Sequence, residues 1–344
     1  MKLYEERQRS RPDDYFADWK EREALAESMI PLIGKLYRNN VKTYIYGQPL
    51  VNRSVLNLMQ DHRFVRQAEG NELSEFETHP VLEILAGLDL GYAHIDVGRI
   101  ASDFFFKSDR GDVPRDQIGK ALEEYVRNEV KDLIGNEQKP LSEPQDVVLY
   151  GFGRIGRLMA RLLIEKTGGG NTLRLRAIVV RRGGEGDLIK RASLLQRDSV
   201  HGPFDGTIRV DEERSSFIAN GNEIRVIYAD SPDTVDYTEY GISNALVVDN
   251  TGKWRDKEGL SLHLRATGVS KVILTAPGKG DMKNIVYGVN SHDIGDEKIL
   301  SAASCTTNAI TPVLKVINDE YGIEVGHIET VHSYTNDQHL IDNY

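Results

Sequence analysis

The single cysteine of this chain, Cys305, lies in the run Ser304-Cys305-Thr306-Thr307. An apolar stripe at helical spacing begins at Ile310, so we expect Cys305 at the start of a helix, behind a short strand ending near Leu300. A helix N-terminus favours the thiolate, which is the nucleophilic form. Most lone cysteines are instead buried small hydrophobic residues, so the neighbours must decide.

A catalytic thiol also needs a base, and His332 is the candidate. It follows Cys305 after a predicted strand over Gly326 to Val331, so the fold can return its imidazole to the sulfur. The hydroxyl groups of Ser304, Thr306 and Thr307 could hold an anionic part of a substrate. Taken alone, one cysteine and one of nine histidines are a weak signal, because such pairs arise by chance.

A second candidate site is the glycine loop Gly151-Phe152-Gly153-Arg154-Ile155-Gly156, between a predicted strand and a predicted helix. This is the context that a dinucleotide-binding loop requires. Gly151 permits the tight turn, Gly153 lets a pyrophosphate approach the backbone, and Gly156 allows close helix–strand packing. The following helix N-terminus offers N–H groups to the phosphates. The alternative is a structural glycine turn in another α/β protein, which this context disfavours.

The second strand of such a fold usually ends in an acidic residue that binds the ribose 2′-hydroxyl. Here the strand ends in Val180-Arg181-Arg182. A guanidinium group can pair with a 2′-phosphate, which favours acceptance of NADP. The sequence equally allows both arginines to be solvated loop residues, with NAD bound without the acidic contact.

The elements that must position these groups begin near residue 144, where apolar runs alternate with helices. The runs are Val147–Tyr150, Ala177–Val180, Ala245–Val248 and Lys271–Leu274. Such runs are typical of strands buried on both faces of a parallel sheet. The segment Phe217–Val226 instead predicts an antiparallel hairpin turning at Asn220-Gly221. We therefore predict an α/β fold with a Rossmann-type doubly wound parallel sheet, followed by the start of an α+β catalytic domain.

Residues 1–143 have a different pattern, that of amphipathic helices. The predicted helices cover Asp13 to Asn39, Val55 to Arg66, a segment beginning after Ser74, and Pro114 to Ile134. Pro31 should kink or break the first of them. Ser54 and Ser74 are predicted N-caps, and Glu77 has the spacing of a capping box. We expect a mainly helical interaction or regulatory module.

The expected domain boundaries follow from this change of pattern. A polar stretch from Gly135 to Pro144 with two prolines suits a linker. We expect a helical extension over 1–143, a nucleotide-binding domain over 144–304 and the beginning of a catalytic domain over 305–344.

Composition limits the classes of partner. The chain has 344 residues and a formal net charge of −10, which argues against a nucleic-acid partner. It has no apolar run of membrane-spanning length and no secretory signal at its start, so we expect a cytoplasmic protein. The cysteine count and histidine spacing predict neither a disulfide nor a metal site.

Four motifs together resemble the glyceraldehyde-3-phosphate dehydrogenase family. In the family's order they are Gly151–Arg157, Asp198–Gly206, Ala303–Asn308 and Thr330–Thr335. The first 140 or so residues are not covered by these motifs and resemble the extension of a longer bacterial branch of the family.

The resemblance implies a role for each site residue. Cys305 would attack the aldehyde carbon of glyceraldehyde 3-phosphate, and His332 would act as general base as hydride passes to NAD or NADP. Inorganic phosphate would then cleave the thioester to 1,3-bisphosphoglycerate. The attacking phosphate would lie at Ser304 and Thr306, and the substrate's own phosphate at Thr335. Further cofactor contacts would come from Arg154, Ile155, Thr251, Gly252 and Thr275.

Departures from the family pattern affect these expectations. Ala309 replaces a second cysteine that many members have, which the chemistry does not require. The chain ends at Tyr344, whereas family members continue with most of the catalytic sheet, an arginine for the substrate phosphate and an asparagine for the nicotinamide. We therefore expect little dehydrogenase activity from the chain as given, and the family's tetramer only at full length.

Two other functions remain open. Asn336-Asp337-Gln338 also resembles the branch that oxidises erythrose 4-phosphate. If the short chain is native, it could be a non-catalytic nucleotide-binding protein that works through its helical half. The presence of both Cys305 and His332 favours an enzyme, because a non-catalytic protein has no chemical need for either.

Overall fold

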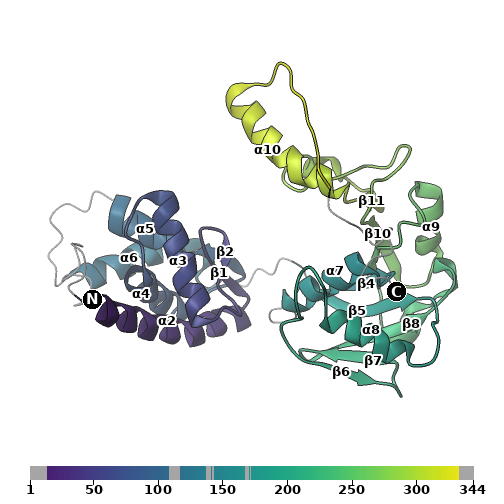
Figure 1. Cartoon of the computed structure of the whole chain (residues 1–344), viewed down its shortest axis with the longest axis horizontal. Helices are drawn as coiled ribbons and strands as arrows, with labels where there is room; N and C mark the ends of the chain where they lie inside the picture. Colours follow the sequence, from purple (N-terminus) through teal and green to yellow (C-terminus); the bar gives the residue numbers. More distant parts are fainter. Residues whose placement is uncertain are drawn as a thin grey trace. The chain divides into compact units, whose positions relative to one another are not determined.

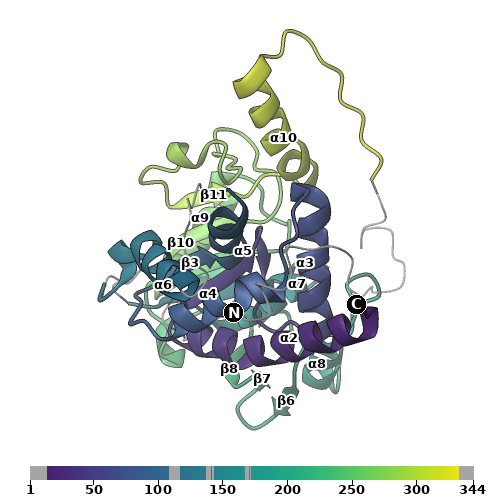
Figure 2. The same cartoon turned by 90° about the vertical axis from the view of Figure 1, so that its left-hand side faces the viewer.

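The computed structural model describes residues 14–107, 117–136, 141, 143–166, 170 and 172–332. The chain divides into two compact units, Met1–Ser142 and Glu143–Tyr344, called here the N-terminal and C-terminal units (Figures 1 and 2). Each has its own hydrophobic core. None of the helices in the described ranges is long and apolar enough to cross a membrane.

The N-terminal unit is mainly helical. Its helices are α2 (Tyr15–Arg38), α3 (Val55–Glu69), α4 (Glu75–Ala86), α5 (Val97–Ser102), a π-helical turn η1 (Asp103–Lys107), α6 (Ile118–Glu129) and a 3-10 turn η3 (Lys131–Leu133). Both predicted N-caps are confirmed. Ser54 Oγ accepts the N–H of Asn57, and Ser74 forms a reciprocal capping box with Glu77.

Three features of this unit differ from the sequence prediction. Helix α2 continues through Pro31 without a break, because its buried face, which includes Met29 and Ile33, packs against the core and offsets the missing hydrogen bond. The helix expected over Pro114 to Ile134 is shorter, and residues 114–116 lie outside the described part. A three-stranded sheet is present that the sequence did not predict.

That small sheet has the order β2-β1-β3. Its strands are β1 (Val41–Ile45), β2 (Gln48–Pro49) and β3 (Ala93–Asp96). Strands this short give too few alternating positions to stand out between long helices.

The C-terminal unit contains an eight-stranded sheet with the order β11-β10-β9-β4-β5-β8-β7-β6. The strands are β4 (Gln145–Tyr150), β5 (Leu173–Val180), β6 (Ile208–Asp211), β7 (Ser216–Ala219), β8 (Asn222–Tyr228), β9 (Ala245–Asp249), β10 (Val269–Leu274) and β11 (Ile299–Ser301). All pairs from β11 to β8 are parallel. The predicted α/β class with a parallel-dominated sheet is confirmed.

The predicted hairpin is also confirmed. Strands β7 and β8 pair antiparallel, with Ala219 opposite Asn222. Asn220 and Gly221 between them have φ values of 46° and 81°, the positive values that a tight hairpin turn needs.

Both faces of the large sheet are buried. The helices of this unit are α7 (Arg154–Glu165), α8 (Asp187–Gln196), α9 (Lys257–Arg265) and α10 (Cys305–Tyr321), with 3-10 turns η4 (Pro232–Thr234), η5 (Tyr237–Tyr240) and η6 (Ser291–Asp293). Val147 and Leu149 of β4 belong to one core, whereas Val148 and Tyr150 belong to the core on the opposite face. This explains why the strand reads as a continuous apolar run.

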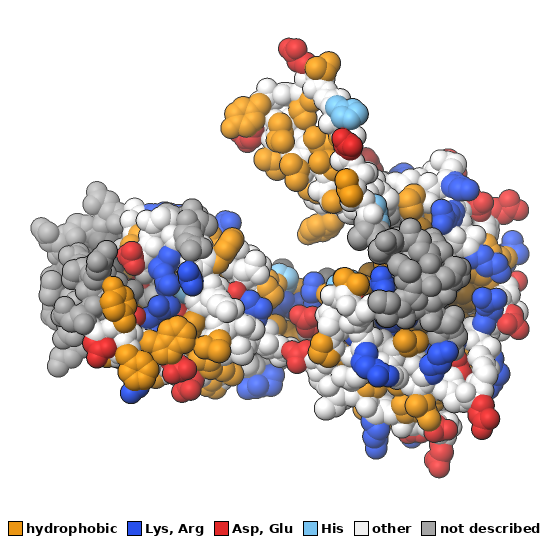
Figure 3. Space-filling view, in the orientation of Figure 1, with side chains coloured by type: hydrophobic (Ala, Val, Ile, Leu, Met, Phe, Trp, Pro, Cys, Tyr) orange, Lys and Arg blue, Asp and Glu red, His pale blue; other side chains and the backbone are white. Residues whose placement is uncertain are grey.

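The segment after β11 has little cover. Helix α10 forms where the sequence predicts it but contains no buried residue, and Figure 3 shows hydrophobic side chains gathered over it. The strand predicted over Gly326 to Val331 is wrong, because residues 322–332 have no regular structure and no strand pairs with them. A strand needs a neighbour for its backbone hydrogen bonds, and no other strand of the described ranges borders this segment.

Candidate dinucleotide pocket and thiol site

The candidate sites lie where the parallel strands end. The carboxyl ends of β5, β4, β9, β10 and β11 share one edge of the sheet, because these strands pair in parallel. The order of strands reverses between β4 and β9, since the chain continues from β4 to β5 and later returns to β9 on the other side. In open α/β sheets, this reversal creates a crevice for ligands.

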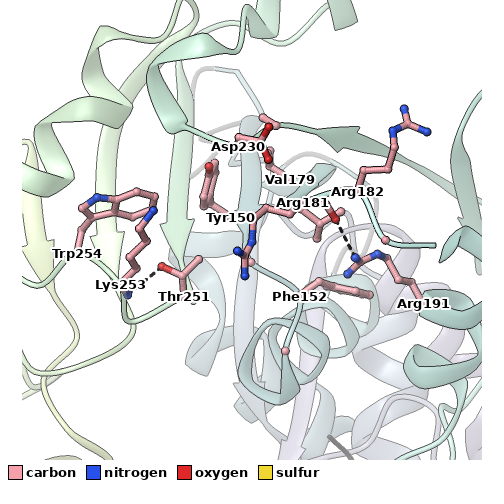
Figure 4. A pocket seen from close by; sticks show the side chains of 15 residues that line it. Tyr150, Phe152, Val179, Arg181, Arg182, Arg191, Asp230, Thr251, Lys253 and Trp254 are labelled. Carbon is pink, nitrogen blue, oxygen red and sulfur yellow. Dashed lines mark hydrogen bonds between the residues drawn. The ribbon is translucent and has the colours of Figure 1, made fainter. Parts of the chain in front are cut away.

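A cavity of about 680 Å³ opens at this point (Figure 4). Its volume lies within the range of small-molecule and cofactor sites. The lining residues are Tyr150, Gly151, Phe152, Gly153, Val179, Val180, Arg181, Arg182, Gly183, Arg191, Ala229, Asp230, Thr251, Lys253 and Trp254.

The three glycines of the loop differ in their surroundings. Gly151 has φ +90°, and a Cβ there would lie 2.8 Å from Thr251 Cγ2. A Cβ on Gly156 would lie 2.4 Å from the carbonyl oxygen of Gly151. Gly153, the N-cap of α7, has open space around its missing Cβ. The first and third glycines are therefore required by packing, and the second leaves room for a pyrophosphate beside the helix N-terminus.

Arginines gather at the β5 end of the cavity. Figure 4 shows the Arg181 side chain directed into the cavity toward Tyr150, and Arg182 directed away from its centre. The Arg182 guanidinium lies 4.3 Å from the ring centroid of Tyr228. Arg191 donates hydrogen bonds to the Arg181 carbonyl (3.1 Å) and to Asp187 (2.8 Å). This end of the cavity can accept an anionic group.

The loop after β9 forms the opposite wall. Asp249 Oδ1 accepts hydrogen bonds from both the N–H and the hydroxyl of Thr251, each at 2.7 Å. Thr275 donates its N–H (3.0 Å) and its hydroxyl (3.1 Å) to the Asp249 carbonyl. Of the predicted cofactor residues, Gly151, Gly153, Arg181, Arg182 and Thr251 line the cavity. The others, which do not line it, are Arg154, Ile155, Gly156, Gly252 and Thr275.

Asp198, within one of the predicted motifs, lies close to the start of α7. Its Oδ2 lies 3.9 Å from Arg154 Nε, and its Oδ1 accepts the N–H groups of Val200 (3.0 Å) and His201 (2.8 Å). Burial raises the pKa of the Asp198 carboxyl, but hydrogen bonds from His201 and Val200 outweigh it and lower the pKa to about 2. The ionised carboxylate attracts Arg154, the first residue of the helix.

The candidate nucleophile is the first residue of α10. Cys305 is exposed, and the hydroxyl of its N-capping neighbour, Ser304, accepts the N–H of Thr307 at 3.0 Å. Cys305 Sγ lies 3.2 Å from His332 Nε2. The hydrogen bond with His332 is the largest influence on the thiol and lowers the pKa of Cys305, with the Thr306 backbone adding to it. The structure thus brings the two predicted residues together.

Three hydroxyl groups belong to the N-cap and first turn of the helix that begins at Cys305. Ser304 Oγ lies 3.1 Å from Thr306 Oγ1 and 2.6 Å from Thr307 Oγ1. Thr335, the third predicted phosphate contact, and the segment Asn336-Asp337-Gln338 lie outside the described residues. Among residues that the structure describes, no group of His, Cys, Asp or Glu side chains could hold a metal ion.

Several cavity residues were not predicted from the sequence. Tyr150 directly precedes the glycine loop, and Trp254 follows the Thr251-Gly252 pair by two positions. Their closeness to these motifs in the sequence could have identified them as cavity residues. Arg191 and Asp230 belong to none of the predicted motifs, and folding brings them to the cavity.

Two family models and several known proteins match this chain. The family model for the NAD-binding domain of glyceraldehyde 3-phosphate dehydrogenase matches residues 145–257, and that for its C-terminal domain matches residues 304–344. A glyceraldehyde-3-phosphate dehydrogenase-like protein of Pseudomonas aeruginosa (strain UCBPP-PA14) is 60% identical over 320 residues, which cover 92% of this chain and 68% of that protein. This alignment is too long for the C-terminal unit alone, so it includes much of the N-terminal unit.

Two further relatives align over a stretch about as long as the C-terminal unit. The glyceraldehyde-3-phosphate dehydrogenases of Clostridium pasteurianum and Thermotoga maritima are each 40% identical over 197 residues, 57% of this chain. The chain spans 55% and 56% of their lengths. With the match to the Pseudomonas protein, these findings show that the chain belongs to the glyceraldehyde-3-phosphate dehydrogenase family, whose first domain binds NAD.

Proposed function

We propose that this chain carries the reacting thiol and the cofactor site of an enzyme that oxidises glyceraldehyde 3-phosphate, with inorganic phosphate, to 1,3-bisphosphoglycerate. The observation that carries the proposal is the 3.2 Å approach of Cys305 Sγ to His332 Nε2. A nucleophile and a base this close, at a helix N-terminus, support covalent catalysis. The thiol follows β11, which ends at the same sheet edge as the dinucleotide cavity.

The first step uses the sulfur and the imidazole. The Cys305 thiolate attacks the aldehyde carbon and forms a carbon–sulfur bond, and the former carbonyl oxygen takes a proton from the His332 imidazolium. The imidazole takes this proton back as hydride leaves the same carbon, which makes a thioester on Cys305. The open backbone at Gly153 and the cavity beside it fit a nicotinamide dinucleotide, which when bound accepts the hydride.

The second step releases the product. An oxygen of inorganic phosphate attacks the thioester carbonyl, and Cys305 leaves as the thiolate. The hydroxyl groups of Ser304 and Thr306, the residues on either side of Cys305 in the chain, donate hydrogen bonds to the attacking phosphate. The family resemblance assigns the contact to the substrate's own phosphate to Thr335, which lies outside the described residues.

The cavity also supports acceptance of NADP beside NAD. Arg181 points into it, Arg182 lies at its rim, and β5 does not end in an acidic residue. Asp230 is the one carboxylate among the lining residues, and the arginines outnumber it. Charge reversal in Arg181→Asp and Arg182→Asp tests this through the ratio of kcat/KM for NADP to that for NAD. The proposal predicts a fall of about tenfold or more in this ratio. A strong preference for NAD that neither substitution changes would overturn it.

The reaction itself is tested by formation of reduced cofactor in the natural protein. Glyceraldehyde 3-phosphate should support turnover that requires inorganic phosphate and is lost in Cys305→Ser. Faster turnover with erythrose 4-phosphate would reassign the substrate while keeping the chemistry. Tight NADH binding with no turnover of either aldehyde would favour a non-catalytic nucleotide-binding protein.

A further inference from the structure

We propose that His263, which touches neither the cavity nor the thiol, positions the wall of the dinucleotide pocket through Asp249 and Thr251. The proposal rests on the dinucleotide site of the proposed function but not on its substrate or its thiol chemistry. His263 lies on α9, and its side chain is fully buried. A buried ring nitrogen is normally hydrogen-bonded, and the partner of Nε2 here is a carboxylate.

That partner is the carboxylate that holds the cavity wall. His263 Nε2 lies 2.9 Å from Asp249 Oδ2, and both side chains are fully buried. The other oxygen of Asp249 accepts the N–H and the hydroxyl of Thr251. Asp249 therefore bridges a buried imidazole on one side and a cavity-lining residue on the other.

The hydrogen-bond pattern fixes which nitrogen carries the proton. The carboxylate can only accept, so Nε2 of His263 donates. Nδ1 of the same ring is buried and has no hydrogen-bond partner among the described residues. The hydrogen bond that the ring makes within the described residues is therefore the one from Nε2, aimed at Asp249.

The ring also supports two aromatic side chains of the cavity. Tyr150 lies edge-on to His263, with ring centroids 4.7 Å apart at 82°. Trp254 lies at 5.8 Å and 84°. Both residues line the cavity, so one buried imidazole braces three lining residues, two by ring contact and Thr251 through the carboxylate.

The position of Thr251 matters because it lies against the glycine loop. Its Cγ2 occupies the space into which a Cβ on Gly151 would project, at 2.8 Å. If the N–H of His263 is lost, one oxygen of a buried carboxylate loses the donor that faces it, and the carboxylate must turn to find another. This turn releases Thr251 and alters the space beside the loop that receives the dinucleotide.

The test is the dissociation constant for NADH, measured by fluorescence titration of the full natural protein. His263→Phe keeps an aromatic ring but removes the donor, and we expect it to raise this constant about tenfold. His263→Gln can place its amide N–H where Nε2 was, and it should restore the constant to within about threefold of the wild-type value.

A matched control separates positioning from stability. Leu195→Ala empties part of a different core on the other face of the sheet, so it should lower the melting temperature and leave the NADH constant unchanged. If His263→Phe behaves in the same way, with a lower melting temperature and unchanged binding, the proposal is overturned.

A second substitution covers the case in which His263→Phe does not fold. Asp249→Asn keeps the shape of the side chain but cannot accept all three hydrogen bonds, and the proposal predicts the same rise in the NADH constant. Unchanged binding in this variant would overturn it. Both readouts concern cofactor binding, so they hold or fail independently of any turnover of glyceraldehyde 3-phosphate.

Discussion

Cys305 Sγ lies 3.2 Å from His332 Nε2, although 27 positions separate the two residues in the sequence. The sulfur belongs to the first turn of α10, and the imidazole comes from the irregular segment that follows this helix. The hydrogen bond between them favours the thiolate, because an imidazole that donates to sulfur stabilises its negative charge. The helix N-terminus acts in the same direction.

The first prediction concerns alkylation of Cys305. Because its pKa is lowered, the pH midpoint of its reaction with iodoacetamide should lie below that of an unperturbed thiol. His332→Asn removes the main cause of the shift and should move the midpoint upward. The chain has no other cysteine, so mass spectrometry reads the rate directly. His327→Asn, an exposed histidine of the same segment, is the matched control and should change nothing.

The second prediction compares two glycines of the same loop. Gly156→Ala places a Cβ against the Gly151 carbonyl, so it should lower the free energy of unfolding by roughly 2 kcal/mol or more. Gly153→Ala meets open space and should leave the melting temperature nearly unchanged, while it weakens NADH binding by filling the approach of the pyrophosphate. Thermal unfolding and NADH titration measure the two effects. Equal stability losses in both variants would contradict these roles.

Much of the C-terminal unit could be predicted because local and global signals agree there. Val147 to Tyr150 form a continuous apolar run, and the structure buries them on both faces of a parallel sheet. The glycine loop follows directly, so its function could be predicted from its spacing together with the strand before it and the helix after it. Cys305 at the start of a helix was predictable for the same reason, since the stripe beginning at Ile310 marks the helix.

The differences between the sequence predictions and the structure have physical causes. Pro31 lacks an N–H, which predicts a break, but burial of Met29 and Ile33 keeps α2 continuous. The apolar residues from Gly326 to Val331 suit a strand, yet no described strand pairs with them. The His263–Asp249 pair joins residues from α9 and β9, and no spacing rule links them. Such contacts depend on the packed fold rather than on local pattern.

The third prediction concerns the pH dependence contributed by Asp198. Its folded-state pKa of about 2 lies below the ordinary value, so the carboxylate stabilises the fold above the unfolded pKa of about 4 and this contribution is lost as pH falls toward 2. Asp198→Asn should therefore cost about 1 to 2 kcal/mol at pH 7, and the difference from wild type should shrink below about pH 4. Urea unfolding at several pH values measures it. A difference that stays constant down to pH 3 would refute the assignment.

The fourth prediction concerns the N-terminal unit, which has its own core and its own buried ion pair. Residues 1–142 expressed alone should unfold cooperatively, as followed by circular dichroism. Glu75 is fully buried and accepts hydrogen bonds from Arg22 at 2.6 Å and 3.2 Å. Glu75→Ala leaves this guanidinium unpaired in the interior and should lower the free energy of unfolding by roughly 3 to 5 kcal/mol.

Glu83, on the same helix, supplies the matched control for that substitution. Its side chain is 61% exposed, so Glu83→Ala should change the free energy of unfolding by less than about 0.5 kcal/mol. Glu75→Gln should fall between the two alanine variants, because the amide oxygen still accepts one bond from Arg22 but carries no charge. Were Glu75→Ala as harmless as Glu83→Ala, the ion pair could not be a structural element of this unit. The absence of a cooperative transition in the isolated segment would instead show that its fold depends on the rest of the protein.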